Sequence, residues 1–151
     1  MFFVGSIGGF FLELFYRKLI LKKWIKPGVF KGFYLPLYGF GLVIIYFCYL
    51  LKISLIFKLI LSMVFLTIIE FICGCIFIKK LKIPLWNYSN QFLNYKGLIC
   101  FKYSIFWALL SLICFIFFEF MRIYTFVIMD MIVMVFEGIL LLDFFVFLKE
   151  K

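Results

Sequence analysis

The chain is dominated by five long apolar stretches, separated by short segments that carry most of its charges. They cover residues 3–16, 36–51, 55–78, 103–118 and 124–148. A helix needs roughly 20 apolar residues to cross a hydrocarbon core of about 30 Å, and the third and fifth stretches reach that length. The other three become long enough when flanking aromatic and lysine side chains anchor their ends at the interface. The pattern predicts an all-α, polytopic membrane protein with about five transmembrane helices.

The composition leads to the same class. Hydrophobic residues make up 68% of the chain and charged residues 15%, and the mean hydropathy is +1.25. These values lie far from those of soluble domains and exclude a water-soluble fold. We therefore expect residues 1–151 to form a single transmembrane domain in which helix packs against helix in lipid.

The net charge of +9 does not indicate nucleic acid binding, because the cations lie in short loops beside the apolar stretches. Thirteen of the sixteen fall on one predicted side: Arg17, Lys18, Lys22, Lys23, Lys26, Lys31, Lys79, Lys80, Lys82, Lys96, Lys102, Lys149 and Lys151. The other side holds Lys52, Lys58 and Arg122. Cytoplasmic loops are enriched in cations, so we expect the N-terminus outside and the C-terminus in the cytoplasm.

The first apolar stretch and the cysteines do not point to a catalytic or metal-binding function. The first stretch lacks a basic leader and a small-residue cleavage site, so we expect it to remain as a helix. The five cysteines lie within or beside the apolar stretches, where small apolar packing explains them better than disulfides. Cys73 and Cys75 form a C-x-C pair, but the chain has no histidine and predicts neither a metal site nor a cofactor.

Ionisable residues inside the apolar stretches are the main candidates for function, because they normally face the protein interior or a water-filled cavity. Glu13 and Arg17 are four residues apart in the order that favours a helical salt bridge. Glu70 has no basic residue within one helical turn, so it needs a partner from another helix.

The last stretch carries three further acids. Asp130 and Glu137 share one helical face and could line a seam, whereas Asp143 falls on a different side near the inner end. The alternative is that these carboxyl groups are protonated or bonded to neighbouring backbone. In the first stretch, Gly5 and Gly9 predict a close approach to a neighbouring helix.

Two segments between the apolar stretches stand out. The first, PGVFKGFYLPLYGFG at residues 27–41, contains two prolines and four glycines, which predict a shaped turn at the interface. The second, WNYSNQFLNYKG at residues 86–97, mixes amides, a serine and aromatic rings, and predicts a folded re-entrant or interfacial element. Both fall on the predicted cytoplasmic side, with Glu70. The candidate site residues near the inner leaflet are Glu13, Arg17, Tyr38, Glu70, Trp86, Asn87, Tyr88, Ser89 and Asn94.

At these residues the chain resembles the bacterial putative ABC-transporter type IV membrane proteins, also called CmpB-like permeases. The resemblance rests on Glu13, Arg17, the GFYLPLYGFG segment, Glu70, WNYS at residues 86–89, Asn94, Gly97, Cys100, Ser104 and Trp107. The family usually has an acid where Asn87 stands and often a basic or polar residue where Leu98 stands.

This resemblance implies a multi-pass subunit of a transporter in the bacterial plasma membrane. The chain has no phosphate-binding loop of the G-x-x-x-x-G-K-[ST] type, so transport would require a separate ATPase. Five spans are few to enclose a pathway, so we expect a homo-oligomer or hetero-oligomer surrounded by membrane lipid.

Two other functions stay open. One is an enzyme acting on lipid-linked substrates at the inner leaflet, with Glu70 or Glu13 as general base and Arg17 or the loop asparagines holding a phosphate or head group. The other is a membrane scaffold subunit that does not transport. A contact between Glu70 and Arg17 that excludes water would indicate this scaffold function.

Overall fold

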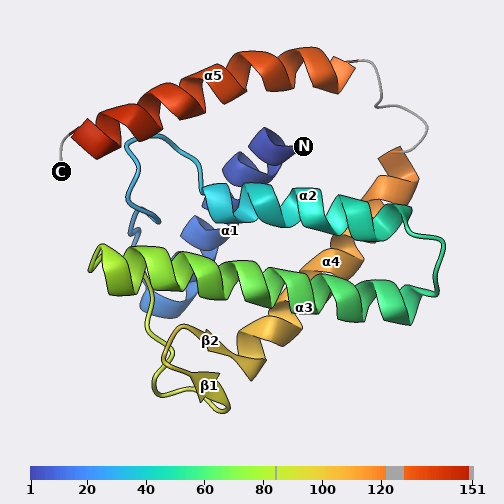
Figure 1. The fold of residues 1–151 in the computed structure, drawn as a ribbon, viewed down its shortest axis with the longest axis horizontal. Coiled ribbons are helices and arrows are strands. Elements are labelled where there is room, and N and C mark those ends of the chain that lie inside the picture. The colour runs from blue at the N-terminus through green and yellow to red at the C-terminus, as the bar shows by residue number, and fades with distance from the viewer. Residues whose placement is uncertain (84, 122–127, 150–151) are drawn as a thin grey trace. The chain divides into compact units, whose positions relative to one another are not determined.

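The computed structural model describes residues 1–83, 85–121 and 128–149, and these residues are mostly helical (Figure 1). In chain order the elements are α1 (Phe2–Leu21), α2 (Pro36–Leu50), α3 (Leu55–Gly74), the π-helix η1 (Cys75–Lys80), β1 (Asn94–Tyr95), β2 (Ile99–Cys100), α4 (Phe101–Met121) and α5 (Ile128–Lys149). The predicted helical class is confirmed. The two short strands, which pair antiparallel, were not predicted.

Two of the described helices are long and apolar enough to cross a membrane. They are Leu55–Lys80, which joins α3 to η1, and Phe101–Met121, with mean hydropathies of 2.5 and 2.2. The helix at Pro36–Leu50 is apolar but shorter. Five spans and their orientation stay predictions.

The helix boundaries follow local backbone chemistry. Lys22 takes a left-handed conformation, with φ of 55°, and ends α1. Pro36 opens α2, because proline's fixed φ and missing N–H suit the first position of a helix. The turn predicted for residues 27–41 therefore ends at Leu35, and its last six residues belong to α2.

The chain divides into two compact units, Met1–Val43 with Arg122–Lys151 and Ile44–Met121. In the first unit, α1 lies very close to the start of α2. A Cβ atom on Gly9 would lie 2.2 Å from Cβ of Tyr38, and one on Gly5 would lie 2.8 Å from the Tyr38 carbonyl oxygen. Only glycine admits a backbone this near, so the close approach predicted from Gly5 and Gly9 is confirmed.

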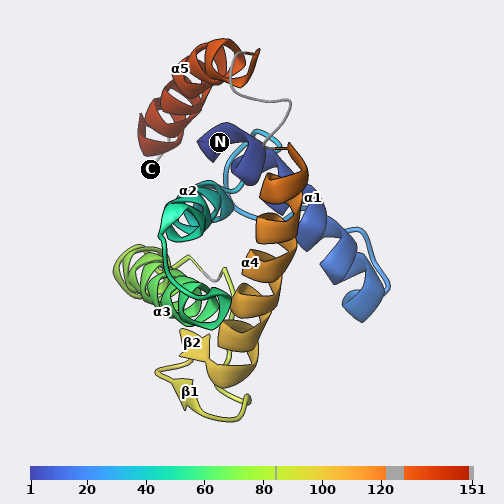
Figure 2. The same ribbon diagram turned by 90° about the vertical axis from the view of Figure 1, so that its right-hand side faces the viewer.

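In the second unit, α3 packs against α4, and the strands lie beside the start of α4 (Figure 2). The buried stripe of α3 consists of Ser62, Leu66, Glu70 and Gly74, spaced four residues apart. The buried residues of α4 are Trp107, Ser111, Phe115 and Phe118. Small side chains in both sets let the helices pack closely.

The segment between the two helices is ordered by its own turns. Leu81 N–H donates to the carbonyl of Ile76 at 2.9 Å, five residues back, as the π-helix requires. The strands are joined by a turn in which Lys96 and Gly97 both have positive φ, which is the signature of a type I′ hairpin turn. Residues 86–97 are therefore folded, as predicted, and their re-entrant or interfacial position stays a prediction.

The close packing of α1 on α2 gives a test with an adjacent control. Gly9→Ala places a methyl group inside the Tyr38 side chain, so we expect it to destabilise the protein by about 1–3 kcal/mol through overpacking. A Cβ on Gly8 meets nothing within 4 Å, so Gly8→Ala should raise stability by about 0.5–1 kcal/mol through better helix propensity. Thermal unfolding in detergent micelles measures both. Equal effects of the two substitutions would contradict this packing.

Candidate functional site

The acid with the least exposure among the described side chains is Glu70, on the face of α3 that packs against α4. Its side chain is only 3% exposed. A carboxyl group that leaves water needs hydrogen-bond partners, since an unsatisfied buried polar group costs about 1–3 kcal/mol and a charged one more. The surroundings of Glu70 supply such partners.

Two aromatic side chains donate to the Glu70 carboxyl group. The Tyr88 hydroxyl donates to Oε1 at 3.0 Å, and the Trp107 indole Nε1–H donates to Oε2 at 3.0 Å. Trp107 lies on α4, so the expectation that Glu70 takes a partner from another helix is confirmed. Tyr88 lies on the segment between the helices. One carboxyl group therefore joins three parts of the chain: α3, α4 and the segment between them.

Stacked rings fix the position of Tyr88. Its ring stacks on Tyr103 with centroids 4.4 Å apart and on Trp86 at 6.2 Å. Its backbone N–H donates to the Gly97 carbonyl at 2.9 Å. Trp86 is itself held by a bond from Nε1–H to the Leu98 carbonyl at 2.8 Å. The Tyr88 hydroxyl is thus preorganised toward Glu70.

The amide-rich residues of this segment hold its own backbone. Asn87 Oδ1 accepts from the Ser89 N–H at 2.9 Å and from the Ser89 hydroxyl at 2.6 Å. Asn94 Nδ2–H donates to the carbonyls of Ser89 and Gln91, each at 3.0 Å, and Asn94 Oδ1 accepts from Gly97 N–H at 3.3 Å. Among the predicted candidates, Asn87, Ser89 and Asn94 therefore shape the hairpin, and a role for them in a substrate pathway stays a prediction.

Two glycines let this segment fold against itself and against α3. Gly97 has φ of 71°, and a Cβ there would lie 2.7 Å from Ser89 Oγ. A Cβ on Gly74 would lie 3.1 Å from the Leu98 side chain. Leu98 is 2% exposed, which suits its apolar side chain.

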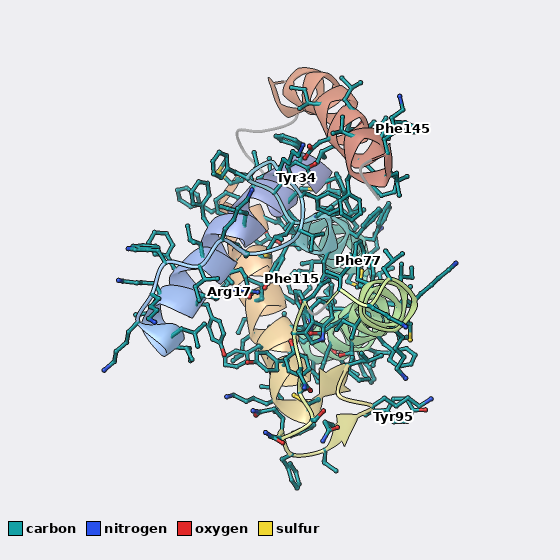
Figure 3. All side chains as sticks on the ribbon, turned by 90° about the vertical axis from the view of Figure 1, so that its left-hand side faces the viewer. Arg17, Tyr34, Phe77, Tyr95, Phe115 and Phe145 are labelled. Atoms are coloured by element: carbon teal, nitrogen blue, oxygen red, sulfur yellow. The ribbon has the colours of Figure 1, made fainter. Side chains whose placement is uncertain are left out.

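A second polar cluster lies in the first unit. Arg17, labelled in Figure 3, lies on α1. Its Nε–H donates to Glu13 Oε1 at 3.0 Å, which confirms the predicted salt bridge. The Tyr38 hydroxyl of α2 donates to the other oxygen, Oε2, at 3.0 Å. The charged side chains are each 25% exposed, so the cluster is more open than that of Glu70. Its predicted convergence with Glu70 at the inner leaflet stays a prediction.

The structure also gives Asp143 a role that the sequence left open. Asp143 Oδ2 accepts from Gly32 N–H at 3.2 Å and from the Tyr34 hydroxyl. Burial and the bond to Asp143 raise the pKa of Tyr34 above its ordinary range. Asp143 therefore ties α5 to the segment before α2. Asp130 and Glu137 were the two acids that could line a seam. Glu137 is exposed, and the side chain of Asp130 lies outside the described residues.

Sequence reasoning missed a third cluster, near the other end of α3 and α4. The Tyr49 hydroxyl donates to Glu119 Oε1 at 2.9 Å, and Lys58 Nζ donates to the Tyr49 carbonyl at 2.6 Å. Lys58 also lies 5.4 Å from the centre of the Tyr49 ring. The sequence did contain a signal for this cluster. Lys58 lies near the start of the apolar stretch at residues 55–78, and Glu119 directly follows the end of the next stretch, at residues 103–118.

A comparison with protein-family models finds a match over most of the chain. The model of the family described as "Putative ABC-transporter type IV" matches residues 1–148. Neither a curated protein nor a solved structure matches the chain. The matched range contains all the polar contacts described above. Because it covers almost the entire sequence, the resemblance is confirmed, and the chain belongs to the putative ABC-transporter type IV family.

Proposed function

We propose that this chain is a multi-pass membrane subunit of a transporter that works with a separate ATPase. The observation that carries the proposal is the Glu70 carboxyl group, which bonds to Tyr88 of the connecting segment and to Trp107 of α4. Family membership and two helices suited to crossing a membrane support it. In this function, Glu70 transmits movement of the hairpin segment to α3 and α4.

The geometry favours a linking role for Glu70 over direct contact with a substrate. The side chain is 3% exposed, and each carboxyl oxygen accepts a hydrogen bond from an aromatic side chain. A general base must reach the proton that it abstracts, either directly or through one water. Glu70 is enclosed, so it is poorly placed to act as a general base, and an enzyme would have to use Glu13, whose side chain is 25% exposed.

The same observation supports a second candidate, a membrane scaffold subunit that does not itself transport. A buried carboxyl group bonded at both oxygens rigidifies a helix pair without opening a path for a substrate. If the chain is a transporter subunit, solute movement needs both the ATPase partner and the Glu70 carboxyl group. If the chain is a scaffold subunit, it needs neither.

Glu70→Gln separates these functions. The glutamine carbonyl can accept from Trp107 and its amide can donate to the Tyr88 hydroxyl, so insertion and folding should be preserved. The substitution removes the strong acceptor character of a carboxyl group, whose hydrogen bonds contribute about 1.5–3 kcal/mol when it is charged. We expect at least a tenfold loss of transport in reconstituted vesicles or of growth in a complementation assay.

Glu137→Gln is the matched control, because Glu137 is an exposed acid on α5. It should leave transport unchanged. Purification in mild detergent should recover a P-loop ATPase with the wild-type chain and with both variants. Full activity of Glu70→Gln would refute the linking role, and an active complex without any ATPase would refute the transporter proposal itself.

The proposed orientation places the hairpin segment in the cytoplasm, and the charge bias of the loops supports it. We test it with single cysteines at two exposed positions, Asn90→Cys in the hairpin segment and Lys52→Cys between α2 and α3, in a chain whose five native cysteines are replaced. In intact cells a membrane-impermeant maleimide should label position 52 and spare position 90. Inverted vesicles should give the opposite result. Labelling of position 90 in intact cells would overturn the orientation.

A further inference from the structure

The hairpin end of the second unit is strongly basic. Residues 71–118 contain five lysines and no acid. All five are exposed: Lys79, Lys80, Lys82, Lys96 and Lys102. The flanking acids do not neutralise them, because Glu70 is buried and Glu119 lies in the last turn of α4, about 25 Å along the helix from Lys102. This end therefore attracts anions.

An apolar groove lies between α3 and the hairpin that carries Lys96. Thr67, Ile68 and Phe71 of α3 form one side, and Tyr95 and Ile99 of the hairpin form the other. Its volume is about 160 Å³. An apolar cavity of about 150 Å³ is large enough to hold benzene, so the groove can take a segment of a hydrocarbon chain.

The Thr67 hydroxyl in the groove wall is directed away from the groove. The Thr67 hydroxyl donates to the Met63 carbonyl at 2.8 Å and is 2.9 Å from Ser104 Oγ. The rings of Phe71 and Tyr95 contact each other, with centroids 5.7 Å apart, and contribute apolar surface to the groove wall. The groove thus suits a hydrocarbon rather than a polar ligand.

Lys96 places a positive charge at the edge of this groove. It follows Tyr95, which is labelled in Figure 3, in the hairpin turn, and the Lys96 Nζ lies 5.0 Å from the centre of the Tyr95 ring. The ring face favours a cation at this position. A ligand with an apolar chain and an anionic head group would match both features.

We propose that this groove binds an anionic phospholipid, with part of an acyl chain between α3 and the hairpin and the head-group phosphate against Lys96. Phe92 and Leu93 of the same segment are 75% and 65% exposed, which suits insertion at a membrane interface. Anionic lipids of the cytoplasmic leaflet attract basic segments at about 1 kcal/mol per cation. The proposal does not depend on transport activity.

Native mass spectrometry of the detergent-purified chain tests the site. The probes are dioleoylphosphatidylglycerol and dioleoylphosphatidylcholine, which share acyl chains and differ in head-group charge. We expect one retained phosphatidylglycerol and weaker binding of phosphatidylcholine. Lys96→Gln should weaken phosphatidylglycerol binding about fivefold. The control Lys52→Gln, at an exposed lysine before α3, should leave it unchanged.

A second variant tests the groove independently of charge. Ile68 is 47% exposed, so Ile68→Trp should fold normally while its larger side chain fills the groove and abolishes retention of either lipid. The proposal is overturned if the two lipids bind equally, if Lys96→Gln and Lys52→Gln behave alike, or if Ile68→Trp retains lipid. It is also overturned if free glycerol 3-phosphate displaces the lipid, or if the groove is covered by a second copy in a lipid-free dimer.

Discussion

The structure of the second unit depends on the hydrogen bonds to one buried carboxyl group, that of Glu70. Glu70 is acceptable on the packed face of α3 because Tyr88 and Trp107 each donate a hydrogen bond to it. The Trp107 indole is buried and the Tyr88 hydroxyl is part-buried, so the hydrogen bonds to Glu70 stabilise all three side chains together. These bonds fix the path of the connecting segment, since Tyr88 must return to α3 after the chain has passed the end of η1.

Close backbone approach is the other constraint, and it acts in both units. Gly9 and Gly5 admit the start of α2 against α1, and Gly74 admits Leu98 of the hairpin segment against α3. In lipid, where the hydrophobic effect does not drive helices together, such contacts and interhelical hydrogen bonds provide the association energy. The Thr67–Ser104 contact at 2.9 Å between α3 and α4 is one of these bonds.

The helical class, the salt bridge of Glu13 with Arg17, the glycine contacts and the need of Glu70 for an interhelical partner could all be predicted from sequence, because each rests on local spacing or on the energetics of one buried group. The identity of the partners could not. Trp107 reaches Glu70 across 37 positions and Tyr88 across 18, and nothing in their local sequence indicates that contact. The contacts of Asp143 with Tyr34 and of Glu119 with Tyr49 are equally non-local.

Hydrogen–deuterium exchange of residues 86–100 tests the central claim, that the Glu70 carboxyl group holds the hairpin segment to α3 and α4. Glu70→Ala removes this acceptor from both donors, and its loss costs about 1–3 kcal/mol at the buried Trp107 indole. Amides of the hairpin should then exchange at least about tenfold faster than in the wild-type chain, whereas Glu137→Ala should leave them unchanged. Unchanged exchange in Glu70→Ala would contradict the claim.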